Sequence, residues 1–247
     1  MKIIYLHQYF KFPDESGGTR SYDLASSLIK QGFDITVVTT TSDKKYKNKT
    51  RWTIIEKEGM EINYVYLPYG NHLTYTKRVL VFFKFLIFSS LRLFKLKADL
   101  IIATSTPLTI GIPVLIKKWF HKTPFVFEVR DVWPEAVIAI GAIRNNLVKK
   151  ILLVLEKLIY ENAETIVPLS TDMQFSIISR FPDLKLKTNI VVENISELNR
   201  FQKNKNRIDL KEYLGFTPRF SILYAGSFGK VNRVDKVIDY AAKLKAY

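Results

Sequence analysis

Two consecutive glycines, Gly17 and Gly18, stand where the chain could bind an anion. Before them runs KIIYLHQYF, whose β-branched and aromatic residues are typical of a strand, and after them runs TRSYDLASSLIKQG, whose apolar residues have helical spacing. Because glycine lacks a Cβ, backbone N–H groups at such a helix start can approach a phosphate closely. The cation Arg20 opposes the helix dipole and favours an anion nearby. The pattern predicts a ligand-binding loop, and the simpler interpretation is an ordinary turn.

A second candidate is the stretch FEVRDVWPE, which starts at Phe127. Arg130 and Asp131 directly follow a predicted strand, and Glu135 closes the stretch. In open α/β sheets ligands bind at the carboxyl ends of the strands, so these residues are placed to contact a substrate. A guanidinium beside a carboxylate is equally typical of a structural ion pair.

A third candidate repeats the arrangement of the first near the end of the chain. The stretch YAGSFGK, which starts at Tyr224, is a further strand-to-helix junction suited to phosphate, and it contains Gly226, Ser227, Gly229 and Lys230. A similar strand-to-helix junction at the start of each half of the chain indicates that the two junctions bind one ligand.

The elements that must position these residues alternate along the chain. Strands are predicted at 2–9, 34–40, 61–67, 99–104, 124–129, 164–169 and 189–193, and helices at 19–31, 77–97, 109–120, 146–162 and 171–180. A hairpin is predicted from Trp52, with its turn near Glu58 and Gly59. Apolar strands that alternate with helices indicate an α/β fold with a doubly wound parallel sheet.

The composition divides the chain into three parts. The alternating pattern covers residues 1–198, and residues 199–217 are polar and basic, as in an interdomain linker. Residues 218–247 contain one strand, a glycine-rich turn and one helix. Because such a unit cannot bury both faces of its strand, we expect it to be the start of a second domain that is cut short.

The net charge of +15 predicts a partner that carries phosphate. Between Glu61 and Glu128 the only acidic residue is Asp99, so the excess of positive charge is concentrated there. Helix 77–97 combines basic and aromatic residues and is interrupted too early to span a membrane, which takes about 20 apolar residues. A helix lying in an anionic membrane surface fits this composition, and a core helix with a solvated lysine edge fits it as well. The predicted membrane contacts are Lys77, Arg78, Phe82, Phe83, Lys84, Arg92 and Lys95.

Several chemistries lack the residues they need. The chain has no cysteine, its three histidines show no metal-ligand spacing, and no Asp-x-Asp pair is present to hold a divalent metal on a diphosphate. No secretory leader is apparent at the N-terminus. Nucleic-acid binding depends on charge alone, because no binding motif supports it. We therefore expect no metal, no other cofactor and no nucleic acid partner.

The ordered set of motifs resembles the retaining glycosyltransferases of family 4. The opening KIIYLHQYFKFPDESGGTRSYDLASSLIKQGFDITVVTT carries the resemblance, together with ILYAGSFGK from Ile222. FEVRDVWPE and ATSTP resemble the branch that builds bacterial O-antigen, capsule or exopolysaccharide, and ENISELNRF from Glu193 occupies the place of the family's linker motif. The resemblance implies the GT-B fold, in which two Rossmann-like domains face each other across the active cleft.

The resemblance also assigns roles to residues. It implies that Gly17 and Gly18 lie near the donor phosphates, that Asp131 orients or deprotonates the acceptor hydroxyl, and that residues 226–230 and Arg233 hold the diphosphate. Its implied partners are a nucleotide-sugar donor and a lipid-linked acceptor. Fixed N–H groups and cations are what the developing charge on the leaving phosphate requires.

The chain departs from the family pattern in several places. Arg130 stands where many relatives carry histidine, and the chain ends before the family's two-glutamate motif. We therefore expect a fragment of a metal-independent transferase of cell-surface polysaccharide biosynthesis, with crippled donor binding and little or no activity by itself. Its expected location is cytoplasmic, on the inner face of the plasma membrane. The alternative is a non-catalytic remnant that keeps acceptor or membrane affinity.

Overall fold

The computed structural model describes residues 1–70, 73–139, 141, 143–188, 190–195, 198, 215, 224, 226 and 233–244. The chain divides into two compact units, Met1–Ser196 and Glu197–Tyr247. The predicted linker 199–217 and the predicted strand after it lie almost wholly outside the described residues. Of the second unit, the structure describes mainly helix α8 (Val234–Leu244).

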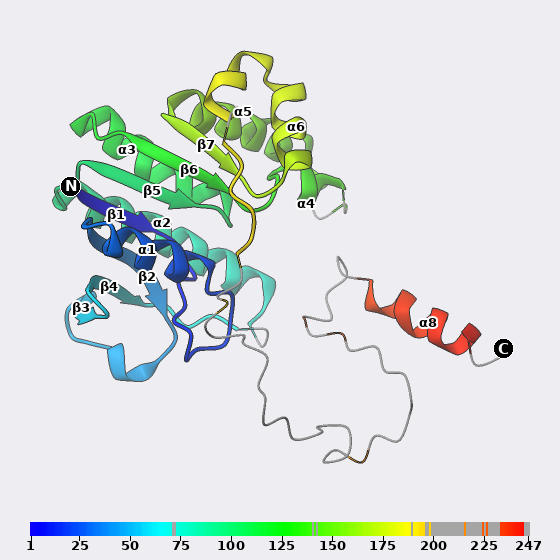
Figure 1. Ribbon diagram of the computed structural model, residues 1–247, viewed down its shortest axis with the longest axis horizontal. Coiled ribbons are helices and arrows are strands. Elements are labelled where there is room, and N and C mark those ends of the chain that lie inside the picture. The colour runs from blue at the N-terminus through cyan, green and yellow to red at the C-terminus, as the bar shows by residue number, and fades with distance from the viewer. Residues whose placement is uncertain are drawn as a thin grey trace. The chain divides into compact units, whose positions relative to one another are not determined.

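The described part of the first unit contains a seven-stranded sheet (Figure 1). Its strands are β1 (Lys2–Leu6), β2 (Asp34–Thr41), β3 (Trp52–Lys57), β4 (Met60–Tyr66), β5 (Leu100–Thr104), β6 (Phe125–Val129) and β7 (Thr165–Pro168), in the order β3-β4-β2-β1-β5-β6-β7. All neighbours pair in parallel except β3 and β4, which form the predicted antiparallel hairpin. The expectation of a parallel α/β sheet is confirmed.

The helices connect the strands as predicted. They are α1 (Arg20–Lys30), α2 (Tyr75–Lys95), α3 (Gly111–His121), α4 (Glu135–Ala139), α5 (Asn146–Asn162) and α6 (Thr171–Arg180). Three short 3-10 segments, η1 (Lys44–Tyr46), η2 (Leu108–Ile110) and η3 (Pro182–Thr188), lie between them. The short helix α4 and the 3-10 segments were not predicted, because each is too short to show a helical period in the sequence.

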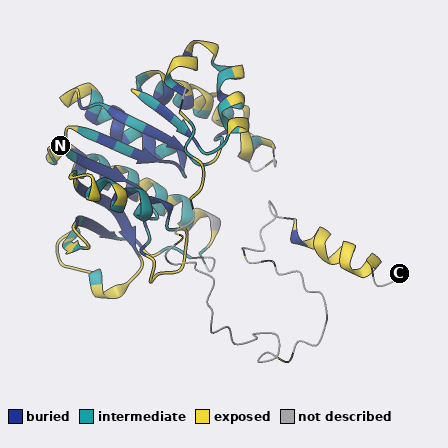
Figure 2. Ribbon diagram, viewed as in Figure 1, coloured by how far each residue is buried: buried dark blue, intermediate teal, exposed yellow. Residues whose placement is uncertain are grey.

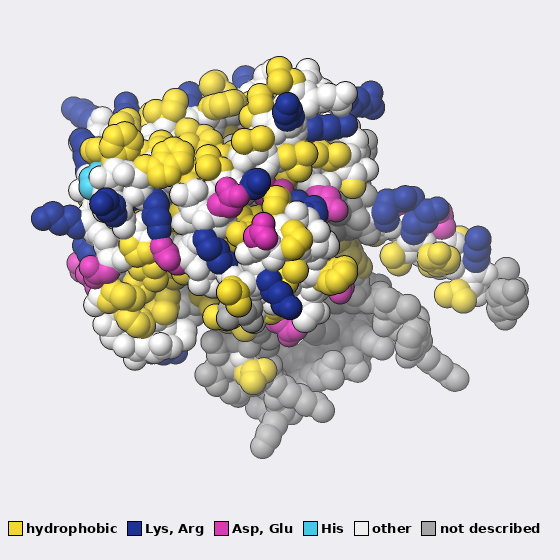
Figure 3. All heavy atoms as spheres, turned by 90° about the horizontal axis from the view of Figure 1, so that it is seen from above, with side chains coloured by type: hydrophobic (Ala, Val, Ile, Leu, Met, Phe, Trp, Pro, Cys, Tyr) yellow, Lys and Arg dark blue, Asp and Glu magenta, His cyan; other side chains and the backbone are white. Residues whose placement is uncertain are grey.

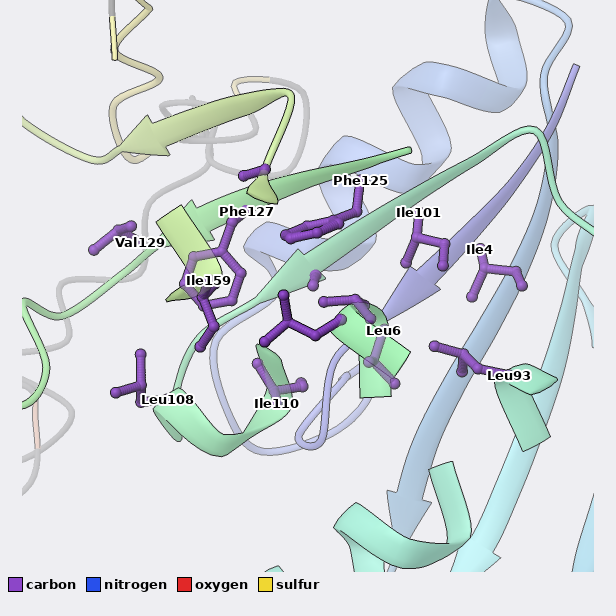
Figure 4. Close-up of a cluster of buried hydrophobic side chains, with 14 of the residues drawn as sticks. Ile4, Leu6, Leu93, Ile101, Leu108, Ile110, Phe125, Phe127, Val129 and Ile159 are labelled. Carbon is purple, nitrogen blue, oxygen red and sulfur yellow. The ribbon is translucent and has the colours of Figure 1, made fainter. Parts of the chain in front are cut away.

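Both faces of the sheet are covered, so successive residues of a strand are buried on opposite sides. In β1, Ile4 and Leu6 join a core beneath α2, α3 and α5, whereas Ile3 and Tyr5 join a second core beneath α1. Figure 4 shows side chains of the first core, and Figure 2 shows that burial is concentrated in the strands. This double burial explains the near-continuous apolar runs.

One glycine is required by helix packing rather than by a turn. A Cβ on Gly111, at the start of α3, would stand 2.2 Å from Ile159 Cδ1 of α5. Two helices approach this closely only where one of them lacks a side chain. Substitution of Gly111 would therefore push α3 and α5 apart.

The predicted strand at 189–193 does not form over residues 190–193, which run alongside β7 without becoming a strand. A single backbone hydrogen bond joins Val192 N to Pro168 O. Pro168 accepts this bond but has no N–H with which to return one, so the pairing does not continue into a ladder here. This part of the expectation is wrong for that reason.

Helix α2 is apolar on its outer side as well as on its buried side. Phe85, Ser89 and Leu93 are buried, while five large hydrophobic side chains are 46–58% exposed: Leu80, Phe83, Ile87, Leu91 and Phe94. At the end of α3, Trp119 and Phe120 are also exposed. In the space-filling view, hydrophobic side chains form patches between Lys and Arg side chains (Figure 3). Of the helices that the structure describes, none is long and apolar enough to cross a bilayer.

Candidate functional site

A cavity of about 240 Å³ opens at the carboxyl edge of the sheet. Its walls come from residues that follow β1, β5 and β6 and from the loop before α1: His7, Tyr9, Gly18, Ser105, Thr106, Arg130 and Asp131. This is the edge at which open α/β sheets bind their ligands, because the loops after parallel strands converge there. The first and second sequence candidates therefore meet in one cavity.

Arg130 supplies a cation to this cavity. Its backbone N–H donates to Ser105 Oγ at 3.0 Å. Among the described residues, no side chain or carbonyl forms a hydrogen bond or ion pair with its guanidinium. A Cβ on Gly18 would stand 3.6 Å from Arg130 Nη2, so the guanidinium faces the glycine loop directly. The ion pair with Asp131 that the sequence left open is not formed.

Asp131 is held by a hydroxyl instead of a cation. Thr106 donates from Oγ1 to Asp131 Oδ2 at 2.6 Å. The described residues supply no hydrogen bond to Asp131 Oδ1. The carboxylate is exposed, so this oxygen is available to accept a hydrogen bond from a substrate hydroxyl.

His7 contributes a neutral imidazole to the cavity wall. It is 4% exposed, and its Nδ1 lies 2.9 Å from Ser21 Oγ in the first turn of α1. Burial, and secondarily the positive charge of Arg130, lower the pKa of His7 to about 3. The imidazole is therefore uncharged at neutral pH and adds no positive charge to that of Arg130.

The two glycines differ in their backbone requirements. Gly17 has φ +139°, a conformation that residues with a side chain rarely adopt. Gly18 has an ordinary φ, and it is the one that lines the cavity. Gly17 thus turns the chain, and Gly18 leaves space beside Arg130.

The prediction that Arg20 binds the ligand is not supported. Arg20 is 5% exposed, and its Nε donates to Glu128 Oε1 at 2.9 Å. Its Nη2 donates to Val192 O at 2.7 Å, and its Nη1 donates to Glu193 O. Arg20 is not among the residues that line the cavity. The anion that pairs with Arg20 at this helix start is therefore the Glu128 carboxylate of the chain itself.

The remaining predicted ligand contacts lie elsewhere or outside the described residues. Glu135 accepts from Ser176 Oγ at 3.1 Å and pairs with Arg180 at 3.4 Å, so it faces α6. In the second unit, Arg233 Nη2 donates to Asp235 Oδ2 at 2.7 Å. Gly226 is described, whereas Ser227, Gly229 and Lys230 lie outside the described residues.

The predicted membrane residues divide into two groups. Lys77, Phe83, Lys84 and Lys95 are exposed. Three others contact the protein: Arg92 donates to Asn63 Oδ1 at 2.7 Å, Arg78 donates to Leu73 O at 3.0 Å, and the Phe82 ring lies 5.8 Å from that of Tyr69. Arg92, one of the predicted membrane contacts, therefore binds a side chain of β4 and does not stand exposed with the lysines.

Sequence reasoning missed four cavity residues: His7, Tyr9, Ser105 and Thr106. A usable signal was present for Ser105 and Thr106, which directly follow the predicted strand 99–104. His7 and Tyr9 were missed because the predicted strand 2–9 included them, whereas β1 ends at Leu6. Within the described part of the chain, no group of three His, Cys, Asp or Glu residues could hold a metal ion.

Comparison with known proteins agrees with this architecture. Two similar solved structures are a sucrose-phosphate synthase from Thermosynechococcus elongatus (14% identity, TM-score 0.57, 87% of this chain and 52% of that chain) and a putative UDP-N-acetylglucosamine 2-epimerase from Listeria monocytogenes (12% identity, TM-score 0.50, 87% and 51%). This chain thus spans about half the length of those proteins, and at such identities the likeness concerns the fold, which confirms the predicted Rossmann-like class.

Among curated proteins, no sequence matches this chain significantly. The family model for the glycosyl transferase 4-like domain matches residues 17–183, which is more than half of the chain and includes the glycine loop, Arg130 and Asp131. This chain belongs to the glycosyl transferase 4-like family.

Proposed function

We propose that this chain takes part in transferring a sugar from a nucleotide-sugar donor to a lipid-linked or saccharide acceptor during the biosynthesis of a cell-surface polysaccharide. Membership of the glycosyltransferase family supports sugar transfer in general. The observation that carries the proposal is the Arg130 guanidinium, which has no partner among the described residues and lies beside Gly18 in the cavity wall. A half-buried cation beside a glycine-containing loop is suited to bind a phosphate.

In the proposed step, the bond between the anomeric carbon of the sugar and the phosphate oxygen of the donor breaks. The acceptor oxygen forms a new bond to that carbon with retention of configuration, and its proton passes to Asp131. Thr106 holds Oδ2 of Asp131, so the opposite oxygen receives the acceptor hydroxyl. Negative charge develops on the departing phosphate, and Arg130 stabilises it. We propose that no metal is needed, since no Asp-x-Asp pair is present to hold one.

A transfer assay tests this proposal. Membranes that contain the chain are incubated with radiolabelled nucleotide sugars, and label is measured in the organic extract. Asp131→Asn should lower transfer by about 100-fold or more, because it removes the proton acceptor. Asp183→Asn, an exposed carboxylate in η3, is the matched control and should leave transfer unchanged. Equal transfer by the wild type and Asp131→Asn would overturn the assigned role.

A second candidate function is a non-catalytic module that binds acceptor or membrane. The observation in its favour is the exposed hydrophobic side of α2, which surface binding alone would explain. This alternative predicts vesicle and pyrophosphate binding without any transfer of label. Transfer that depends on Asp131 would exclude it.

We further propose that the chain works in the cytoplasm, on the inner face of the plasma membrane, and that the outer side of α2 contacts anionic lipid. The exposed hydrophobic stripe of α2 runs the length of the helix, and the exposed rings of Trp119 and Phe120 lie at the end of the neighbouring α3. Lys77, Lys84 and Lys95 are exposed on the same helix. Apolar side chains flanked by lysines suit a helix lying in an anionic interface.

Vesicle flotation tests the membrane contact. Phe83→Ser should reduce binding to vesicles that contain anionic lipid, because it removes an apolar group that would enter the interface. Ile54→Ser is the matched control, since Ile54 is 51% exposed on β3 and Phe83 is 58% exposed on α2. Equal binding by the two variants, or equal binding to neutral and anionic vesicles, would count against this surface.

A further inference from the structure

Four buried polar residues form a continuous network beside the cavity. Thr104 Oγ1 donates to Glu128 Oε2 at 2.9 Å and lies 3.3 Å from Tyr5 Oη. The other carboxylate oxygen of Glu128 accepts from Arg20. All four side chains are at most 5% exposed. We call Tyr5, Thr104, Glu128 and Arg20 the polar network.

Each member of the polar network stands two residues along the chain from a residue that lines the cavity. The pairs are Tyr5 with His7, Thr104 with Thr106, Glu128 with Arg130, and Arg20 with Gly18. The network therefore joins the ends of β1, β5 and β6 to the start of α1, directly behind the cavity walls. Each member is therefore tied through two residues of backbone to a wall of the cavity.

Arg20 extends the network to the segment 190–195, which immediately precedes the second unit in the chain. That segment belongs to no strand and has one backbone hydrogen bond to β7, from Val192 N. Two guanidinium nitrogens of Arg20 bind the carbonyls of Val192 and Glu193. The planar guanidinium can bind a carboxylate and two carbonyls at once, which a lysine ammonium on its flexible stem cannot do in the same geometry.

We propose that Arg20 is a positioning residue that couples the cavity to the segment leading to the second unit. By holding Glu128 and the 192–193 carbonyls together, it sets the place of Gly18 and Arg130 relative to the path of the chain toward residue 196. The effect on ligand binding rests on the proposed function, whereas the hold on the segment does not.

The test compares Arg20→Lys with Arg180→Lys in the full chain. Arg180 also binds a fully buried carboxylate, with Nη1 and Nη2 at 2.7 and 2.9 Å from the oxygens of Glu156. Unlike Arg20 and Glu128, neither Arg180 nor Glu156 stands two residues from a residue that lines the cavity, and Arg180 has no hydrogen bond to the described residues 190–195. Both variants lose charge-assisted hydrogen bonds to a buried glutamate. Two quantities are measured: the hydrogen exchange of the amides of residues 190–195 and the affinity for inorganic pyrophosphate. Both are compared under conditions in which the two variants have the same free energy of unfolding.

Arg20→Lys should speed exchange in residues 190–195 by about tenfold over Arg180→Lys, the change expected for losing one charge-assisted hydrogen bond. It should also weaken pyrophosphate binding, while Arg180→Lys changes neither. Equal exchange in the two variants would overturn the proposal.

If the wild type does not bind pyrophosphate, the proposed function fails, but the exchange data still decide whether Arg20 holds the segment. If Arg20→Lys does not fold, Thr104→Val replaces it and should show a smaller change in the same direction, because it removes only the hydroxyl that orients Glu128; no change would overturn the proposal.

Discussion

Arg20 and Arg130 stand at the same edge of one sheet but have opposite surroundings. Arg20 is buried, and three of its nitrogens are bound to a carboxylate and two carbonyls of the chain. Arg130 is half-buried, and no described residue binds its guanidinium. The first holds the architecture together, and the second is available to a ligand.

The two arginines differ in their surroundings because of one residue, Glu128 of β6. Glu128 points toward the α1 side of the sheet and meets Arg20, whereas the chain beyond Val129 has left the sheet when it reaches Arg130. A buried charge requires a fixed partner, while an arginine at a cavity edge can leave its own partner to a substrate. The same residue type thus serves structure or ligand binding according to burial.

The largest expected effect is on stability, at the buried pair. Glu128→Ala should lower the free energy of unfolding by about 3–5 kcal/mol, because it leaves the Arg20 guanidinium buried without its carboxylate. Denaturant unfolding measures the loss. A loss of less than about 1 kcal/mol, typical of exposed pairs, would mean that Arg20 and Arg130 do not differ as described.

The next effect is on binding, at the exposed arginine. Arg130→Gln should weaken the affinity for inorganic pyrophosphate by about 10- to 100-fold through loss of a charge-assisted contact, with little change in stability. Calorimetry measures the pyrophosphate affinity of this variant and of the control Lys97→Gln. Lys97 is an exposed cation just before the first residue of β5, so the control removes the same charge at the end of the strand opposite to the cavity. Equal weakening in the two variants would indicate a general charge effect instead of a site.

The pH dependence of stability reports on His7, which lies beside Arg130. The pKa of His7 is about 3 in the folded chain and 6.5 in an ordinary exposed site, so the unfolded chain binds a proton first as the pH falls. Its contribution is fully present above pH 6.5 and is lost toward pH 3, by at most about 1.4 kcal/mol per pH unit. The stability of His7→Gln should fall less steeply between pH 6.5 and 5. Parallel curves for the two proteins would show that His7 is not held neutral.

The smallest effects separate the two glycines. Gly17→Ala should cost about 1 kcal/mol, because it forces a side chain into a positive φ and against Lys11. Gly18→Ala should change stability by less than about 0.5 kcal/mol, since its Cβ would make an ordinary contact with Arg130. It should nevertheless weaken pyrophosphate binding by filling space beside the guanidinium. The reverse ranking of stabilities would exchange the roles assigned to the two glycines.

Much of the fold was predictable because strands buried on both faces leave long apolar runs and helices leave a clear period. Six of the predicted strands and all five helices in residues 1–180 are present, with ends shifted by a few residues. The strand at 189–193 failed because Pro168 ends the ladder, a consequence visible only once β7 is known to be its neighbour. The candidate site was predicted in part, since Gly18, Arg130 and Asp131 line one cavity with four residues that were missed.

The amino-acid sequence by itself determined the class of fold and the edge of the sheet where chemistry can occur, because periodicity and the residues at strand ends are local properties. Only the tertiary structure decided which arginine is free to meet a ligand. That choice depends on Glu128 and on the carbonyls of Val192 and Glu193, which are more than a hundred residues from Arg20 in the chain and become its partners only when the sheet assembles.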